Sequence, residues 1–96
     1  MAYRIYATAH SMEFRGLDMR TSKKSERTFL VLRFEDMEGH SNEISCSDSD
    51  LFNACNNLKK GDICELPLVF VSTSQYSFVN LCSAPDVRGN AYAGME

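Results

Sequence analysis

The chain has 96 residues, of which 44% are hydrophobic and 24% are charged, and its formal net charge is −3. These values describe one ordinary folded domain and exclude a low-complexity disordered chain. No apolar run approaches the roughly 20 residues of a membrane-spanning helix. The N-terminal MAYRIYATAH alternates in polarity, unlike the continuous apolar block of a signal peptide. We therefore expect an intracellular domain that does not contact a membrane.

The four cysteines, at positions 46, 55, 64 and 82, form no Cys-x-x-Cys pair, and their gaps are too wide for a zinc ribbon or knuckle. Cys46, Cys64 and Cys82 fall inside predicted strands, where a free thiol packs as a small hydrophobic group. We expect buried thiols, with no disulfide, metal or other cofactor. A reducing cytoplasm suits this best.

Residues 3–14 alternate, with Tyr3, Ile5, Ala7 and Ala9 on one side and the residues between them on the other. This period of two indicates a half-buried strand. The segment is longer than a typical strand, so we expect it to bend or bulge and to serve both sides of a barrel.

A basic stretch follows at residues 15–27 (RGLDMRTSKKSER), with five cations against two anions and no apolar periodicity. Its local charge is +3, so the remainder of the chain carries −6. This asymmetry predicts a long basic loop between the first two strands. Its cations are Arg15, Arg20, Lys23, Lys24 and Arg27.

Two further strands are predicted at residues 28–35 (TFLVLRFE) and 41–46 (SNEISC), joined by the turn 36–39. In the first of them Leu30, Leu32 and Phe34 form one apolar row. The opposite row, which contains Phe29 and Arg33, mixes aromatic, aliphatic and charged groups and is expected to face solvent. In the second, the inward residues are Ile44 and Cys46.

A short helix of two or three turns is predicted after residues 47–50 (SDSD), whose side-chain oxygens cap free amide donors. The apolar residues at helical spacing are Leu51, Phe52, Cys55 and Leu58, and the cations and glycine of residues 59–61 close the helix. We expect this helix to plug one end of a barrel.

The fourth strand opens at Asp62, and its apolar row is Cys64, Leu66, Leu68 and Phe70. Pro67 lies on the other row and predicts an edge or bulge, because proline has no amide to donate. Residues 72–75 read as a hairpin loop and residues 76–82 as the last strand, with Val79 and Leu81 inward. From residue 85 the composition is small and polar, so we expect a loose tail over 85–96.

The predicted order is strand, long loop, strand, turn, strand, short helix, strand, hairpin, strand. This is the element order of the OB-fold, an all-β, five-stranded Greek-key barrel that binds oligonucleotides on its strand 2–3 face and two of its loops. The phrase LKKGD at residues 58–62 before an alternating strand is typical of such domains. We expect an OB domain over residues 1–84 with one short helix between strands 3 and 4.

Proteins that bind single strands combine a basic groove with exposed rings on which bases stack. The loop could simply be polar because it is solvated, and each ring alone is more often packing. The basic loop and the exposed rings together favour single-stranded nucleic-acid binding. A further ring, Tyr6, faces the same way as Arg4 on the first strand. The candidate binding residues are Arg15, Arg20, Lys23, Lys24, Arg27, Phe29, Arg33, Tyr76 and Phe78.

Over residues 14–85 the layout resembles the helix-destabilising, gene V type single-stranded DNA-binding proteins of filamentous phages. In that family a basic hairpin wing bearing aromatics follows the first strand, as does the segment 15–29 here. A late Gln-aromatic tip, here Gln75-Tyr76, precedes an alternating strand, here residues 78–81, and a terminal proline, here Pro85. The resemblance implies a symmetric homodimer that coats single-stranded DNA with little sequence preference in the cytoplasm of a bacterial or phage-infected cell.

Three alternatives stay open. RNA is possible, because nothing in the sequence is positioned to read a 2′-hydroxyl group. The same barrel could be a protein-interaction or replication accessory module that uses an exposed strand edge. Catalysis has little support, because His10 and His40 have no partner motif and no phosphate loop or nucleophile elbow is present. We do not expect an enzyme.

Overall fold

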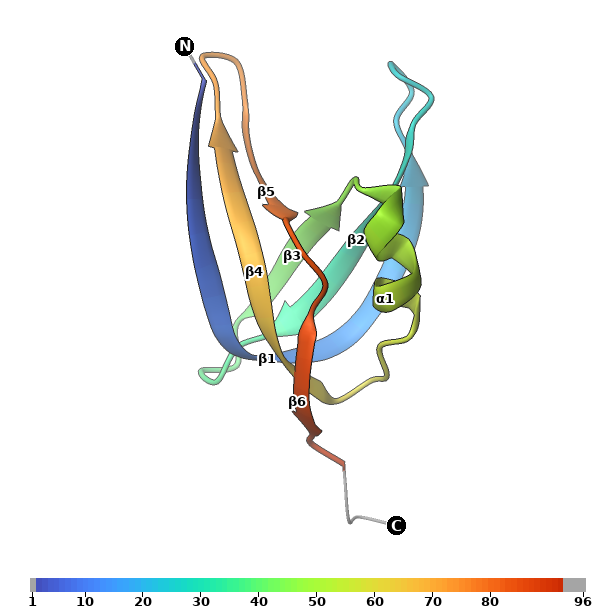
Figure 1. The fold of residues 1–96 in the computed structure, drawn as a ribbon, viewed down its shortest axis with the longest axis vertical. Helices are drawn as coiled ribbons and strands as arrows, with labels where there is room; N and C mark the ends of the chain where they lie inside the picture. The colour runs from blue at the N-terminus through green and yellow to red at the C-terminus, as the bar shows by residue number, and fades with distance from the viewer. Residues whose placement is uncertain (1, 93–96) are drawn as a thin grey trace.

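The computed structural model describes residues 2–92. Six strands and one short helical segment follow one another along this part of the chain (Figure 1). The predicted strands at 28–35 and 41–46 are confirmed with those bounds. The elements are β1 (Tyr3–Thr21), β2 (Thr28–Glu35), β3 (Ser41–Cys46), a 3-10 turn (Ser49–Leu51), α1 (Phe52–Asn56), β4 (Asp62–Ser72), β5 (Ser77–Leu81) and β6 (Asp86–Asn90).

Five of these strands close into a ring in the order β1–β2–β3–β5–β4, with β4 returning to β1. The long β1 makes this possible, because its N-terminal half pairs with β4 and its C-terminal half pairs with β2. The strand changes partner around two register shifts. The first lies between Ala9 and Met12, where Ser11 has a positive φ of 55°, and the second lies between Phe14 and Gly16. The prediction of a bent first strand is confirmed. The domain is a small all-β barrel of OB type.

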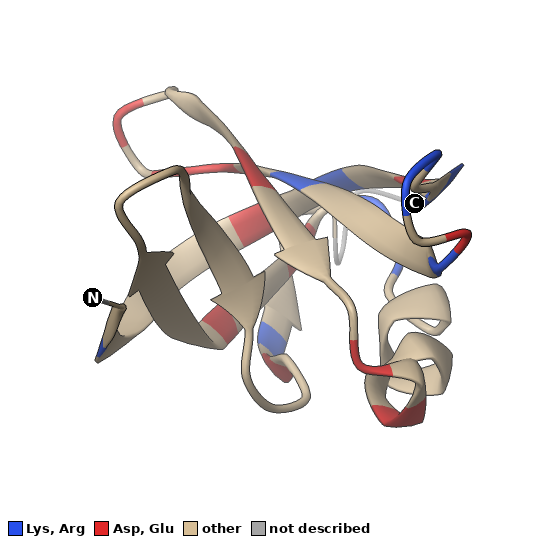
Figure 2. Ribbon diagram, turned by 90° about the horizontal axis from the view of Figure 1, so that it is seen from above, with Lys and Arg blue, Asp and Glu red and all other residues tan. Residues whose placement is uncertain are grey.

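Beyond the barrel, the ends of β1, β4 and β5 continue as a three-stranded extension, which we call the wing (residues 3–7, 69–72 and 77–79). The paired parts of β1 and β2 with their turn form a hairpin, which we call the arm (residues 16–33). Its base belongs to the barrel, and its tip extends beyond it. The ring between the wing and the arm closes narrowly, through one residue pair of β3 and β5, Ser45 with Asn80. The wing and the arm project on opposite sides of the molecule (Figures 1 and 2).

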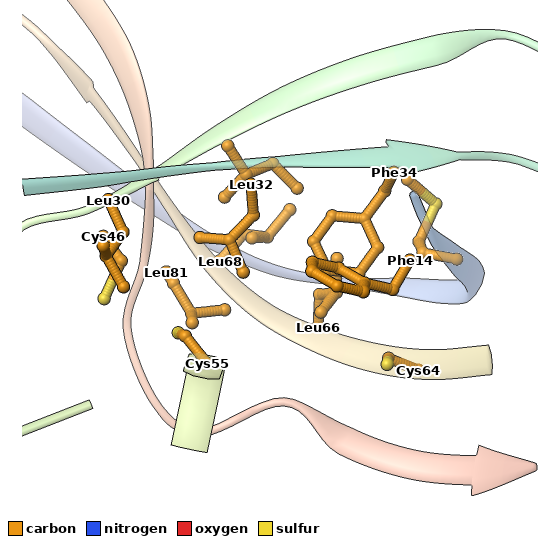
Figure 3. Close-up of a cluster of buried hydrophobic side chains, with 12 residues drawn as sticks. Phe14, Leu30, Leu32, Phe34, Cys46, Cys55, Cys64, Leu66, Leu68 and Leu81 are labelled. Atoms are coloured by element: carbon orange, nitrogen blue, oxygen red, sulfur yellow. The ribbon is translucent and has the colours of Figure 1, made fainter. Parts of the chain in front are cut away.

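The barrel core is formed by the apolar rows that alternation predicts. Leu30, Leu32 and Phe34 of β2 are fully or almost fully buried. Phe34 meets Phe14 of β1 edge to face, with ring centroids 5.5 Å apart, a favourable geometry for two aromatic rings. Figure 3 shows these side chains converging with those of the neighbouring strands. The other core members are Met12, Ile44, Cys46, Cys55, Cys64, Leu66, Leu68 and Leu81.

The helical segment covers one end of this core. The Asp48 side chain accepts from the amide of Asp50 (2.9 Å), so the predicted capping at residues 47–50 is confirmed. Cys55 of α1 is buried in the core, while Leu51 and Phe52 pack against it from outside. One fully buried side chain and a few half-buried ones are enough to hold so short a helix in place, because tertiary packing supplies most helical stability.

The tail predicted over residues 85–96 is wrong for its first half. Asp86–Asn90 form β6, which pairs antiparallel with β4; residues 93–96 lie outside the described part of the chain. The buried carboxylate of Asp62 accepts from Asn90 Nδ2 (2.9 Å). Gly61 has a φ of +92°, and a Cβ there would lie 2.5 Å from the Tyr92 ring. The missing side chain of Gly61 makes room for the Tyr92 ring, and Asn90 ties β6 to the buried Asp62.

The described residues include no helix that is long and apolar enough to cross a membrane. Cys46, Cys55 and Cys64 are free and buried, and burial raises the pKa of the Cys64 thiol to about 11. The prediction for Cys82 is wrong. Its thiol is exposed, because Cys82 follows the buried Leu81 at the end of β5 and lies on the outer row with Phe78 and Asn80.

Candidate nucleic-acid interface

The basic stretch 15–27 is mostly strand. Residues 16–21 of β1 pair with residues 28–33 of β2, which leaves a turn of only residues 22–27. The amide of Glu26, which has a positive φ of 55°, donates to Ser22. The prediction of a long loop over residues 15–27 is therefore wrong, and the stretch is a paired hairpin with a short tip.

Three of the predicted phosphate-binding arginines are engaged with carboxylates. Arg15 donates to Glu13 (2.5 Å) and lies near Glu35; these contacts raise the pKa of its guanidinium, mainly through the Glu13 hydrogen bond. Arg20 lies 3.7 Å from Glu43 and 3.9 Å from Asp18. Arg33 donates to Asp18 (2.5 Å). A phosphate group would have to compete with these acids for each arginine.

Arg33 is also built into the sheet. Its guanidinium lies over Gly16, where a Cβ would come within 2.5 Å of Nη2. Gly16 stands opposite Arg33 at the register shift of β1, so the missing side chain makes room for the arginine to cross the strand and reach Asp18. The position of Arg33 fits a structural ion pair better than a phosphate contact.

The tip of the arm keeps its cations free. Lys23, Lys24 and Arg27 are exposed, and within residues 2–92 none of them lies in an ion pair. Phe29, predicted to be exposed, is half-buried opposite Arg20. In Figure 2 the blue of lysine and arginine gathers at this tip, on the opposite side from the N-terminus.

The second group of predicted residues lies on the wing. The rings of Tyr76 and Phe78 stack on each other, with centroids 5.6 Å apart and planes inclined by 20°, and they are 57% and 38% exposed. The turn before them is held by Thr73, whose hydroxyl accepts from the amides of Gln75 and Tyr76. Two adjacent rings, both open to solvent, are thus presented on a braced hairpin.

The strand register brings more residues to the same face. Val71 stands between Phe78 and Arg4, and Val69 stands between Asn80 and Tyr6. Together these side chains line a shallow hollow, which we call the aromatic face. It is lined by Arg4, Tyr6, Val69, Val71, Tyr76, Phe78, Asn80 and Cys82.

Sequence reasoning omitted Arg4, Tyr6 and Asn80 from the candidate site. The period of two placed Arg4 with Tyr6, but it could not show that β1 pairs with β4, the first strand of the hairpin that carries Tyr76. The residues that line the aromatic face include one cation and no carboxylate. This distinguishes it from the arm, where acids alternate with the arginines.

The predicted site residues therefore do not form one surface. The aromatic face lies on the outer row of β4 and β5, opposite the row that carries Leu66, Leu68 and Leu81 into the core. The tip of the arm projects from the other side of the barrel (Figure 1). A single strand would contact both only by passing around the barrel.

No other chemistry is assembled in the part of the chain that the structure describes, where no three His, Cys, Asp or Glu side chains form a metal-binding group. Asp36 accepts from the amides of His40 and Glu38, and these bonds hold its pKa below the ordinary value. They stabilise the β2–β3 turn. Comparisons with known proteins found no matching family model, no matching curated protein and no matching solved structure.

Proposed function

We propose that this protein binds single-stranded nucleic acid, DNA in the first place, with little sequence preference. The observation that carries the proposal is the aromatic face. The Tyr76–Phe78 stack is exposed, Tyr6 and Arg4 lie on the same side of the sheet, and no carboxylate lines the hollow. Rings of this kind stack with any base, because every base has a π-face.

Arg4 suits the sugar–phosphate backbone of a strand whose bases stack on these rings. Base–aromatic stacking contributes about 1–3 kcal/mol per base, and an arginine beside the rings adds charge without a competing acid. Asn80 offers an amide to base edges or phosphates on the same face. The polar and aromatic groups that such a site needs come here from β1 and β5.

The tip of the arm has a supporting role in this proposal. Lys23, Lys24 and Arg27 raise the local potential within a Debye length of about 10 Å at moderate salt, although the chain as a whole carries −3. Arg15, Arg20 and Arg33 contribute less than their number suggests, because each is already paired with a carboxylate. The expected binding is moderate in strength and sensitive to salt.

As part of the same proposal, we place the protein in the cytoplasm of a bacterial or phage-infected cell. This location is supported by the four free cysteines, which suit a reducing compartment. A homodimer belongs to the proposal as well, and the edge of the wing provides a physical basis for one.

The proposal is tested by titrating a fluorescent oligo-dT with the protein at several salt concentrations. If three or four phosphates are neutralised, the log–log slope of affinity against salt is about −2 to −3. Tyr76→Ala should weaken binding by roughly 5- to 150-fold, from the loss of one stacked base, and leave the slope unchanged. Replacing Lys23, Lys24 and Arg27 by alanine should flatten the slope by about 2 if the bound strand passes around the barrel to the tip of the arm, and by much less if the strand stays on the aromatic face.

Lys59→Ala with Lys60→Ala is the matched control, because it removes two exposed cations at the other end of the barrel. It should change neither the affinity nor the slope by more than a general charge effect. Indifference of the wild-type chain to oligonucleotides at low salt would refute the proposal and favour a protein-interaction module.

A further inference from the structure

The outer edge of the wing is a strand edge without a partner. Residues Tyr3–Ala9 of β1 pair with β4 on one side in unbroken register, and β2 joins β1 only from Glu13 onward. Within residues 2–92, no strand pairs with the other side of this segment. In Figure 1 it forms the outer boundary of the sheet.

The backbone direction along this edge follows from Pro67. The Pro67 carbonyl accepts from the amide of Cys82 (2.9 Å), so the backbone of Pro67 points toward the β5 side of β4 and away from β1. Thr8 stands opposite Pro67. Two opposed residues of an antiparallel pair exchange either two hydrogen bonds or none. Because the Pro67 backbone points away from β1, Pro67 and Thr8 exchange none, and the N–H and C=O groups of Thr8 point to the open edge. By alternation Arg4, Tyr6 and Thr8 all turn their N–H and C=O groups to the open edge.

Side chains on both faces of this edge are exposed as well. Tyr3 and Ile5 on one face are 59% and 55% exposed, and Tyr6 on the other is 66% exposed. Of the usual protections of an edge strand, the segment has a single charged side chain, Arg4, and it contains no proline, lysine or bulge before Ser11. A straight and weakly protected edge is a template for another strand.

We propose that this edge pairs with the same edge of a second copy, antiparallel about a two-fold axis at Tyr6. Among the symmetric registers, this one uses the whole straight segment Tyr3–Ala9 and pairs all three outward residues. Tyr6 meets Tyr6 of the second copy, and Arg4 meets Thr8. Large residues meet small ones on the other face, where Tyr3 lies opposite Ala9 and Ile5 opposite Ala7.

Charge and symmetry favour a second copy over a different partner. Arg4 is the one charged residue of Tyr3–Ala9, and the two-fold register keeps the two Arg4 side chains apart, each opposite a neutral threonine. Like charges directly opposite each other would destabilise the pair. Because an isologous contact uses the same edge on both copies, it closes at a dimer and does not propagate into a fibre.

The proposed dimer is supported by the geometry of the strand edge alone, whereas its effect on DNA binding rests on the proposed function. Strands paired in one sheet share their faces, so the aromatic faces of the two copies become one surface across the axis. Tyr6 and Arg4 of both copies lie at its centre, and a Tyr76–Phe78 stack lies on each side. The binding face of one copy is thus half of a larger site.

Sedimentation of the wild-type chain without DNA tests the dimer. We expect twice the mass of one chain, and about 30-fold weaker association for Thr8→Pro, which removes an outward donor from each copy and no bond to β4. Thr8→Val keeps the donor and should remain dimeric. A monomeric wild-type chain at its highest soluble concentration, or a Thr8→Pro variant that dimerises like the wild type, would overturn the proposal.

A cross-link fixes the register and does not depend on Thr8→Pro folding. In a Cys82→Ser background, Tyr6→Cys should give a disulfide-linked dimer under mild oxidation, because hydrogen-bonded opposite residues have Cα atoms about 5.5 Å apart, within disulfide range. Arg4→Cys should not cross-link, because its copies lie four residues out of register. The reverse result would refute the axis at Tyr6.

Oligonucleotide binding separates the two proposals. If both hold, Thr8→Pro should weaken binding of a long oligo-dT more than that of a short one, because only the long strand spans both copies. A dimer that ignores oligo-dT would overturn the proposed function and leave the dimer standing. Equal effects on both lengths would overturn the joined surface.

Discussion

The barrel and the wing are built from the same strands, yet they differ in how much they bury. Along one row of β4, Leu66 is fully buried and Leu68 is 6% exposed, whereas Phe70 is 42% exposed. On β1, Met12 and Phe14 are buried while Ile5 and Tyr3, on the wing, are open. The alternation continues without interruption along β4 and changes phase on β1 at the register shift between Ala9 and Met12. In both strands the apolar row extends into the wing, but the layer of side chains that covers it in the barrel does not. Most of the burial, and with it the stability, therefore resides in the barrel, whereas the wing leaves apolar groups exposed to solvent.

The largest difference is expected between two substitutions on that row. Leu66→Ala should lower the free energy of unfolding by about 2–5 kcal/mol, because it leaves a cavity in a closed core. Phe70→Ala should cost about 1 kcal/mol or less, since part of its ring is already in water. Urea denaturation followed by circular dichroism measures both. Equal losses would show that the wing is as well packed as the barrel.

A smaller effect is expected where β6 seals the barrel at the end away from the wing. Asn90→Ala removes a donor to the buried Asp62 carboxylate (2.9 Å) and to the Lys60 carbonyl (3.2 Å). An unsatisfied buried acceptor should lower the free energy of unfolding by about 1–3 kcal/mol. Arg88→Ala on the exposed side of β6 is the control and should be nearly neutral. Neutrality of Asn90→Ala in the same urea titration would mean that β6 does not hold this end closed.

The smallest effect is expected at the bend where the barrel passes into the wing. The Glu65 carboxylate accepts from the Ser11 amide (2.9 Å) and lies 3.2 Å from His10 Nδ1, and these contacts, the Ser11 bond first, lower its pKa. A lowered folded pKa contributes stability that is present above the ordinary glutamate pKa of about 4.3 and is lost as the pH falls through the folded value.

Glu65→Gln removes that titration. Its Tm should therefore fall less than that of the wild type as the pH is lowered from about 6 to about 3. Glu26→Gln, at the exposed tip of the arm, is the matched control and should follow the wild-type curve. If Glu65→Gln also follows it, the Ser11 contact does not fix the bend.

Much of the fold could be predicted from local pattern. Alternation at Leu30, Leu32 and Phe34 identified a core row because a strand repeats every two residues. The excess length of the first strand predicted its bend. The β6 strand escaped notice because its five residues, DVRGN, lack an apolar row; β4 recruits them through backbone bonds and through Asn90.

The candidate site was predictable only in part. Tyr76 and Phe78 were identified as exposed rings, and Lys23, Lys24 and Arg27 as cations of the basic stretch. The number of charges in residues 15–27 could not reveal that Arg20 and Arg33 share Asp18 and that Arg20 also meets Glu43. Glu43 is remote in sequence, and Asp18 meets Arg33 only across the β1–β2 ladder. Arg4 joins the aromatic rings for a similar reason, through β4.

Spacing between neighbouring residues was enough to predict the order of the first five strands and the short helix, the apolar rows of β2 to β5 and the sign of each segment's charge. The tertiary structure alone decided where the core ends along β1 and β4, which arginines are neutralised and which strand edge stays open. Those features depend on pairs that the closing of the ring brings together, and the energy of a pair is set by distance in space.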